Sequence, residues 1–279
     1  MNTFTGNQSF CIMRTLAFLF VLLLCSCEKG DHPLDKQPEV EVVNAKYFIK
    51  WNYPYATGVN LHANARLVYN NNKPIMRSGS YLPVWGGYDP NAYTDQIFDT
   101  VTEVNSQKLL LQSINKLQTG PINQPRWEIE MVDKRPVKRI SYIYNAGSYL
   151  PADTVIYYYD LNKQVQRVES HSTVQGVSYL MVKTFFFTDG NLQKIDGIYI
   201  KKPNTVQYFT VETFSSYDTK PNTLKALWLW DDLYYRSVSA NNFAAYTYKK
   251  LDTQSNLIDA AEISWNLRYD AEGNITFER

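Results

Sequence analysis

A cluster of aromatic side chains in one irregular segment is the first candidate for binding chemistry. Trp228, Trp230, Tyr234 and Tyr235 lie close together there, and Trp85 lies in a second segment of the same kind. Flat apolar rings stack on sugar rings, and neighbouring polar groups bond the sugar hydroxyls. In β proteins, however, aromatic residues also fill cores and form cross-strand pairs. The cluster therefore predicts contact with a glycan or peptide, and a core role is the alternative.

The cysteines predict a second chemistry, lipid attachment. Residues 15–24 are apolar and follow Arg14, which is typical of a signal peptide and too short for a membrane span of about 20 residues. They run into Leu24-Cys25-Ser26-Cys27, a pattern typical of a bacterial lipobox. Cleavage before Cys27 would leave a diacylglycerol on its thiol and an acyl chain on its amine, and such chains anchor a protein stably. We predict lipidation at Cys27; a plain secreted protein is the alternative.

Other site chemistry is not indicated. Every cysteine lies in or next to the leader, so the mature chain has no thiol for a disulfide, a nucleophile or a zinc–thiolate site. The three histidines, His32, His62 and His171, lack ligand spacing. Nucleophile-elbow, Walker and dinucleotide motifs are absent from the sequence. Lys and Arg number 28 against 27 for Asp and Glu, so no basic excess favours nucleic acid. The sequence predicts no metal, no cofactor and no catalytic residue.

Alternating hydrophobicity predicts the elements that position these residues. Residues 58–70, 126–133 and 261–270 each place apolar side chains at every second position. This period is typical of strands with one wet face, as in antiparallel sheets. Residues 107–117 fit either a strand or a helix.

An internal repeat of hairpins is the strongest pattern. An aromatic or apolar strand, an aspartate, a few turn-forming residues and a second strand recur five times. Aspartate opens such turns because its carboxylate accepts a backbone N–H two residues further on. The segment 227–243 stretches the last interval and is where we predict a short helix. The turn aspartates are Asp133, Asp160, Asp189, Asp218 and Asp270, at spacings of 27, 29, 29 and 52 residues.

Consecutive hairpins predict an all-β, antiparallel up-and-down meander, with a sheet that curls or becomes barrel-like to protect its edges. A parallel α/β fold would need crossover helices, for which the sequence has no pattern. We divide the chain into a lipoprotein signal peptide (1–26), a tether (27–40), an N-terminal β region (41–130) and a hairpin-repeat β domain (131–279). One elongated β domain is the alternative to the last two.

The repeats resemble known families. The Tyr-Asp hairpins resemble the YD units of Rhs-type repeat proteins. RYDAEGNITF, SSYDTKPNTLKAL and the SANNF at 239–243, together with the lipobox, resemble Bacteroides-type lipoproteins of a domain-of-unknown-function family with a porin-like fold. Glu28, Lys29 and Asp31 resemble the export signal that places such lipoproteins on the outer face of the cell. The resemblance implies a porin-like sheet and an outer-membrane location, and it implies no activity.

Three functions follow as expectations. The first is a non-catalytic cell-envelope lipoprotein, held to the outer membrane by its N-terminal lipid, that binds a glycan or peptide. The second is a structural or assembly component that pairs with other envelope proteins. The third and weakest is a glycan-active enzyme, which would need two carboxylates facing each other across a cleft.

Overall fold

The computed structural model describes residues 40–47, 63–71, 73–84, 87–116, 125–230, 234–264, 266–271, 273 and 275–278. Residues Val40–Arg279 form one compact unit, separate from Met1–Glu39. The signal peptide, the lipidation residue Cys27, the tether as far as residue 39, and Trp85 therefore lie outside the described residues.

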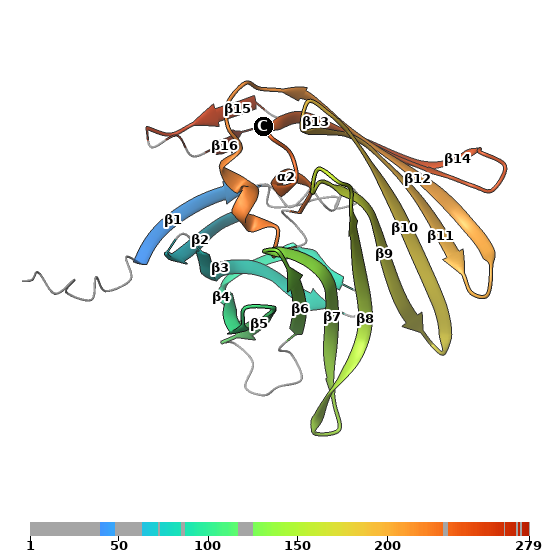
Figure 1. The fold of residues 1–279 in the computed structure, drawn as a ribbon, viewed down its shortest axis with the longest axis horizontal. Helices are drawn as coiled ribbons and strands as arrows, with labels where there is room; N and C mark the ends of the chain where they lie inside the picture. The colour runs from blue at the N-terminus through green and yellow to red at the C-terminus, as the bar shows by residue number, and fades with distance from the viewer. Residues whose placement is uncertain are drawn as a thin grey trace, which may run out of the picture. The chain divides into compact units, whose positions relative to one another are not determined.

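A single large antiparallel sheet dominates the unit (Figure 1). Its 14 strands lie in chain order, so each strand pairs with its sequence neighbours, as an up-and-down meander requires. This confirms the predicted all-β meander. Within the described residues β1 and β14 do not pair with each other, so the sheet is open, and a separate two-stranded hairpin, β15–β16, contacts β1. The strands are β1 (Val40–Tyr47), β2 (Ala63–Asn70), β3 (Lys73–Val84), β4 (Gly87–Asn105), β5 (Lys108–Asn115), β6 (Arg126–Val132), β7 (Arg135–Asn145), β8 (Ser148–Tyr159), β9 (Val165–Val174), β10 (Val177–Thr188), β11 (Asn191–Lys201), β12 (Thr205–Tyr217), β13 (Phe243–Leu251), β14 (Leu257–Ser264), β15 (Asn266–Tyr269) and β16 (Ile275–Glu278).

Three sequence segments show how the alternating pattern became strands. The ambiguous segment 107–117 is a strand, β5, paired with β4 and β6. The run 261–270 keeps its alternation but is divided between β14 and β15, which belong to different sheets. The domain boundary expected at residue 130 falls inside β6, which is paired on both sides. The ladder of backbone hydrogen bonds therefore continues across that position.

The hairpin turns alternate between two ends of the sheet. Asp133-Lys134 and Asp189-Gly190 have positive φ at both residues, which suits the right-handed twist of the flanking strands. Asp160 opens a longer turn in which its Oδ1 accepts the N–H of Gln164 at 2.8 Å. In a meander every second turn lies at the same end, so these aspartates share one end with Asp218, which follows β12. We call this the Asp-turn end.

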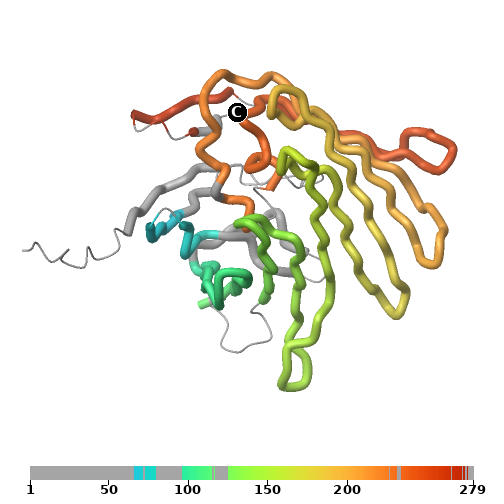
Figure 2. Tube along the Cα trace, in the orientation of Figure 1, coloured from blue at the N-terminus to red at the C-terminus, as the bar shows by residue number. Residues whose placement is uncertain are grey.

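The opposite end carries turns of another composition. Ala146-Gly147 and Gln175-Gly176 join β7 to β8 and β9 to β10, again with positive φ at both positions. Lys202-Pro203 lies between β11 and β12. Figure 2 shows the tips of these successive hairpins side by side. We call this the opposite end.

Residues 218–242 interrupt the repeat between β12 and β13, and we call them the insertion. The hairpin predicted at Asp218 does not form, because a 3-10 helix, η4 (Thr223–Leu227), replaces its second strand. Asn222 starts this helix by accepting the N–H of Leu224 at 2.9 Å, and a capping side chain of this kind stabilises a helix start. A short helix, α2 (Tyr234–Ser237), follows and confirms the helix expected in 227–243.

The core lies between the insertion and one face of the sheet, which we call the inner face. Arg77 of β3 places its guanidinium carbon 5.1 Å from the ring centre of Trp230 in the insertion. Asn191 of β11 exchanges hydrogen bonds of 3.1 and 2.9 Å with Asn241, also in the insertion. Strands far apart in the sheet thus contact the same segment, so the sheet bends around it. Buried core residues include Leu67, Leu111, Ile129, Phe185, Ile195, Phe214, Leu227, Leu229 and Tyr246.

Candidate functional site

The predicted aromatic cluster lies in or against the core. Trp230 is 2% exposed and Tyr234 is 9% exposed. Trp228 and Tyr235 are half-buried and pack against the core residues. Tyr235 meets the ring of Phe214 edge-on at 5.6 Å. The core role that the sequence left open therefore describes most of the cluster, and Trp230 and Tyr234 offer no open ring face to a ligand.

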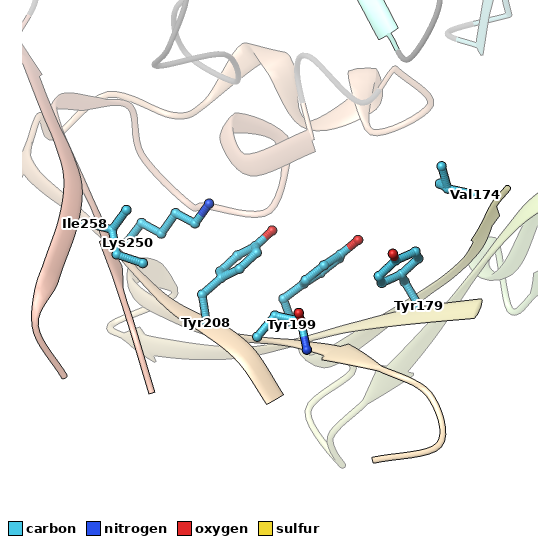
Figure 3. A pocket seen from close by; sticks show the side chains of 7 residues that line it. Val174, Tyr179, Tyr199, Tyr208, Lys250 and Ile258 are labelled. Atoms are coloured by element: carbon cyan, nitrogen blue, oxygen red, sulfur yellow. The ribbon is translucent and has the colours of Figure 1, made fainter. Parts of the chain in front are cut away.

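Another set of aromatic side chains does reach solvent, and we call it the tyrosine ladder: Tyr179, Tyr199 and Tyr208. Their rings stand in a row across β10, β11 and β12 (Figure 3). The ring centres of Tyr179 and Tyr199 are 5.3 Å apart with planes 12° from parallel. Those of Tyr199 and Tyr208 are 4.7 Å apart with planes 18° from parallel. Lys250 of β13 extends the row, with its Nζ 4.0 Å from the centre of the Tyr208 ring.

Strand alternation explains why these rings share the inner face. Tyr179 lies six residues before the buried Phe185 on β10, and Tyr208 six before the buried Phe214 on β12. An even separation along a regular strand puts two side chains on the same face. Tyr199 is the direct cross-strand partner of Tyr208, so their rings pack together. The ladder is therefore the continuation of the core face beyond the part that the insertion covers.

The ladder borders an open concavity of about 470 Å³. Val174 and Ile258, which are 54% and 53% exposed, contribute apolar surface to its sides, and Gln207 contributes an amide. The described lining residues include no carboxylate, imidazole or thiol. Hydrogen bonding and ring contact are the chemistry that this surface offers.

Two phenols of the ladder, those of Tyr199 and Tyr208, hold their protons more tightly than an exposed tyrosine. Partial burial, together with the neighbouring Tyr199, raises the pKa of Tyr208 to about 12, against the opposing effect of Lys183. Partial burial and Tyr179 also raise the pKa of Tyr199. A neutral phenol both donates and accepts a hydrogen bond. Because the rings are stacked, the ladder presents ring edges and hydroxyl groups to a ligand instead of broad ring faces.

A buried polar cluster separates the ladder from the core. Lys183 Nζ lies 2.8 Å from Glu212 Oε1, and the Tyr246 hydroxyl donates to Glu212 Oε2 at 2.7 Å. Lys183 also donates to the hydroxyl of Tyr235. Burial is the largest single influence and lowers the pKa of Lys183, but the charges of Glu212 and Tyr235 and the hydrogen bonds to both together outweigh it, so the net shift is upward. This network connects β10, β12 and β13 to α2, and so fixes the strands that carry the ladder.

Sequence reasoning missed the ladder although a signal for it existed. Tyr199 and Tyr208 flank the turn-forming segment KKPN, so a hairpin there brings them close together, and a register shift between Tyr199 and Ile200 makes them direct cross-strand partners. The predicted site was instead the irregular segment around Trp228 and Trp230, because functional residues concentrate in loops. The turn aspartates, by contrast, have structural contacts: Asp218 accepts from Asn242 N at 3.1 Å and from the Tyr269 hydroxyl, and the N–H of Gly273 donates to the carbonyl of Asp270 at 3.1 Å.

Metal sites and membrane-spanning helices are two other features that could carry a function. Among the described residues, no group of three or more His, Cys, Asp or Glu side chains is placed to hold a metal ion. The Nζ of Lys202 lies 3.3 Å from the Nδ1 of His171. None of the helices in the described part of the chain has the length and apolar character needed to cross a membrane.

Comparisons with known proteins return structures but no sequence relatives. No protein-family model matches the chain, and no curated protein matches it. A porin-like protein from Bacteroides vulgatus aligns over 84% of this chain and 88% of its own, with 10% identity and a TM-score of 0.47. A porin-like protein from Bacteroides uniformis aligns over 86% of this chain and 93% of its own, also with 10% identity, and a TM-score of 0.40.

Proposed function

We propose that the protein is a lipid-anchored component of the bacterial cell envelope that binds a glycan on the tyrosine ladder without changing it chemically. The observation that carries the proposal is the row of Tyr179, Tyr199 and Tyr208 on the uncovered part of the inner face, beside a concavity of about 470 Å³. Neutral phenols and an amide suit a ligand rich in hydroxyl groups, because each can donate and accept.

The envelope location rests on the amino-terminal sequence. Residues 15–24 and the lipobox ending at Cys27 support export and lipidation, and Glu28, Lys29 and Asp31 favour the outer surface of the outer membrane. A Cys27→Ala variant is expected to leave the membrane fraction of cells. Recovery of that variant in the membrane fraction at the wild-type level would count against the anchor.

We propose a non-catalytic role because of the residues that line the concavity. General acid–base or nucleophilic chemistry needs a carboxylate, imidazole, thiol or activated hydroxyl at the bound ligand. The described residues around the ladder supply phenols, one amide and one ammonium. Release of new reducing ends from a bound glycan would contradict this part of the proposal.

Binding is tested with the mature chain on a glycan array, followed by titration calorimetry with the best ligand. A Tyr199→Ala/Tyr208→Ala variant is expected to lose binding by at least about tenfold, since each aromatic contact in a binding groove contributes on the order of 1 kcal/mol. The matched control is Tyr158→Ala on β8, a tyrosine with 42% exposure next to the inward-facing Tyr157 and hence on the outer face. Equal loss in the control, or binding only of peptides, would overturn the proposal.

An assembly role is the second candidate, and the edge strand β14 favours it. Within the described sheet β14 pairs with β13 alone, and its Leu257 is among the most exposed apolar side chains. An unpaired strand edge can accept a strand from a partner. Crosslinking in cells should then yield a defined complex through β14. A strictly monomeric protein in intact cells would exclude this role.

A further inference from the structure

A second cavity lies at the Asp-turn end, far along the strands from the turns of the opposite end. It has a volume of about 160 Å³ and is bounded by two hairpin turns and the insertion. The β6–β7 turn supplies Lys134 and Arg135, the β8–β9 turn supplies Lys163, and the insertion supplies Trp228. We call it the cationic cavity. A space of this size holds about one six-membered ring.

The rim of the cationic cavity is positively charged. Lys134 and Lys163 are exposed at its edge, and Arg135 is half-buried in its wall. No carboxylate is among the described lining residues. The nearby Asp133 lies 3.6 Å from Arg135 and offsets one of the three charges. Asp160, in the same turn as Lys163, accepts the N–H of Gln164 and keeps its own negative charge. Three cations against these two carboxylates leave an excess of one positive charge at the rim.

Both rim lysines occupy backbone positions that favour glycine. Lys134 has φ 63° and Lys163 has φ 67°, in the left-handed region that side chains with a Cβ rarely adopt. Lys134 is the second residue of a two-residue turn, the position that Gly147, Gly176 and Gly190 occupy in three other turns of the sheet, and Lys163 lies in the longer turn that Asp160 opens. The chain thus places a lysine at each of the two turns that border the cationic cavity.

The interior of the cationic cavity has an apolar part, and Gln164 and Ser237 also line it. Arg135 stacks its guanidinium carbon 5.1 Å from the ring centre of Tyr159, whose hydroxyl donates to the Pro136 carbonyl at 2.7 Å. Val165 and the half-buried Trp228 complete the apolar part of the wall. An apolar wall with a cationic rim selects a compact ring that carries a negative charge at one side.

We propose that the cationic cavity binds the carboxylate-bearing ring of an acidic sugar, a hexuronate residue. The ring would lie against Trp228 and Val165, and its carboxylate would face Lys134, Arg135 and Lys163. An indole and an aliphatic side chain suit the apolar face of a pyranose, and the cations distinguish it from a neutral hexose. The site is independent of the tyrosine ladder, because no residue lines both.

The test titrates the mature full-length chain with sodium glucuronate, glucose and inorganic phosphate to millimolar concentration, followed by calorimetry. Saturable binding of glucuronate and none of glucose is expected. A Lys134→Gly/Lys163→Gly variant should weaken glucuronate binding at least about tenfold, without a lower melting temperature, because glycine relieves the left-handed backbone. The control is Lys201→Ala/Lys249→Ala, which removes two exposed lysines elsewhere and should bind like the wild type.

Each other outcome overturns the inference. Undetectable glucuronate binding, equal binding of glucose, or full binding by the glycine variant would remove the site. Displacement of glucuronate by an equal concentration of phosphate would show a general anion site instead of a sugar site. The Tyr199→Ala/Tyr208→Ala variant should keep its glucuronate binding, so failure of the ladder proposal and failure of this one are distinguishable.

Discussion

The two ends of the inner face have the same strand pattern, but the insertion covers only one of them. Toward the Asp-turn end, inner-face residues such as Phe185 and Phe214 meet the insertion and form the core. Toward the opposite end, Tyr179 and Tyr208 of the same strands reach beyond the insertion and stay half-exposed. Coverage by the insertion, and not the alternation of the strands, therefore separates core from candidate ligand surface.

The largest loss of stability is expected from a substitution in the insertion itself. A Trp230→Ala variant removes a buried indole and the partner of Arg77. We expect the free energy of unfolding to fall by about 3–5 kcal/mol, as for other buried tryptophans. Urea denaturation followed by circular dichroism measures it. A loss below about 1 kcal/mol would mean that the insertion does not hold the core.

The buried ion pair should show the next largest effect. Glu212→Gln leaves the half-buried ammonium of Lys183 beside an uncharged amide, and breaking such a pair costs up to about 3 kcal/mol. The matched control is Glu103→Gln, which breaks the exposed pair with Lys73 and should cost about 0–1 kcal/mol. Equal urea midpoints for the two variants would contradict the assignment of Glu212 to the interior.

The ladder should matter less to stability than to binding. Tyr199→Ala removes two ring contacts at a half-exposed position, so we expect a loss of about 1 kcal/mol in the free energy of unfolding. Thermal denaturation and glycan titration of the same sample separate the two effects. If the loss of stability equalled that of Trp230→Ala, the two ends of the inner face would not differ as described.

The smallest effect should appear only at high pH. Tyr208 has a pKa of about 12 in the folded protein, against about 10 when unfolded. The folded state therefore holds its proton longer, so the contribution of Tyr208 to stability is complete below pH 10 and is lost as the pH rises to 12. Tyr208→Phe should consequently reduce the fall in urea midpoint over this interval. An identical fall in both proteins would place the Tyr208 hydroxyl in open water.

The sequence predicted local structure well, since local patterns determine it. The alternation in 126–133 became β6, and the aspartates at 133, 160 and 189 became turns at one end of the sheet. The strand expected after Asp218 failed because the Asn222 side chain caps a helix there. Whether a strand or a helix forms there depends on the single side chain of Asn222, in a segment that also contains turn-forming residues.

The position of the aromatic residues was less predictable. Trp230 is buried because the sheet bends until Arg77, more than 150 positions earlier in the chain, meets it. Periodicity along one strand contains no information about such a contact. The approach of Tyr199 to Tyr208 is local, but their direct pairing depends on a register shift beside Tyr199 that the turn residues do not predict. The stacking of Tyr179 on Tyr199 follows only once β10 and β11 are in register.

The neighbour-to-neighbour order of the strands also bears on how the chain could acquire its structure. Most strands of the sheet pair with a strand that follows after a short turn, so pairing can advance along the chain from one hairpin to the next. The insertion follows β12, and its long-range contact with β3 cannot form until most of the sheet has emerged. We therefore expect the interior to close late in folding, with the apolar inner face of the sheet uncovered until the insertion packs against it.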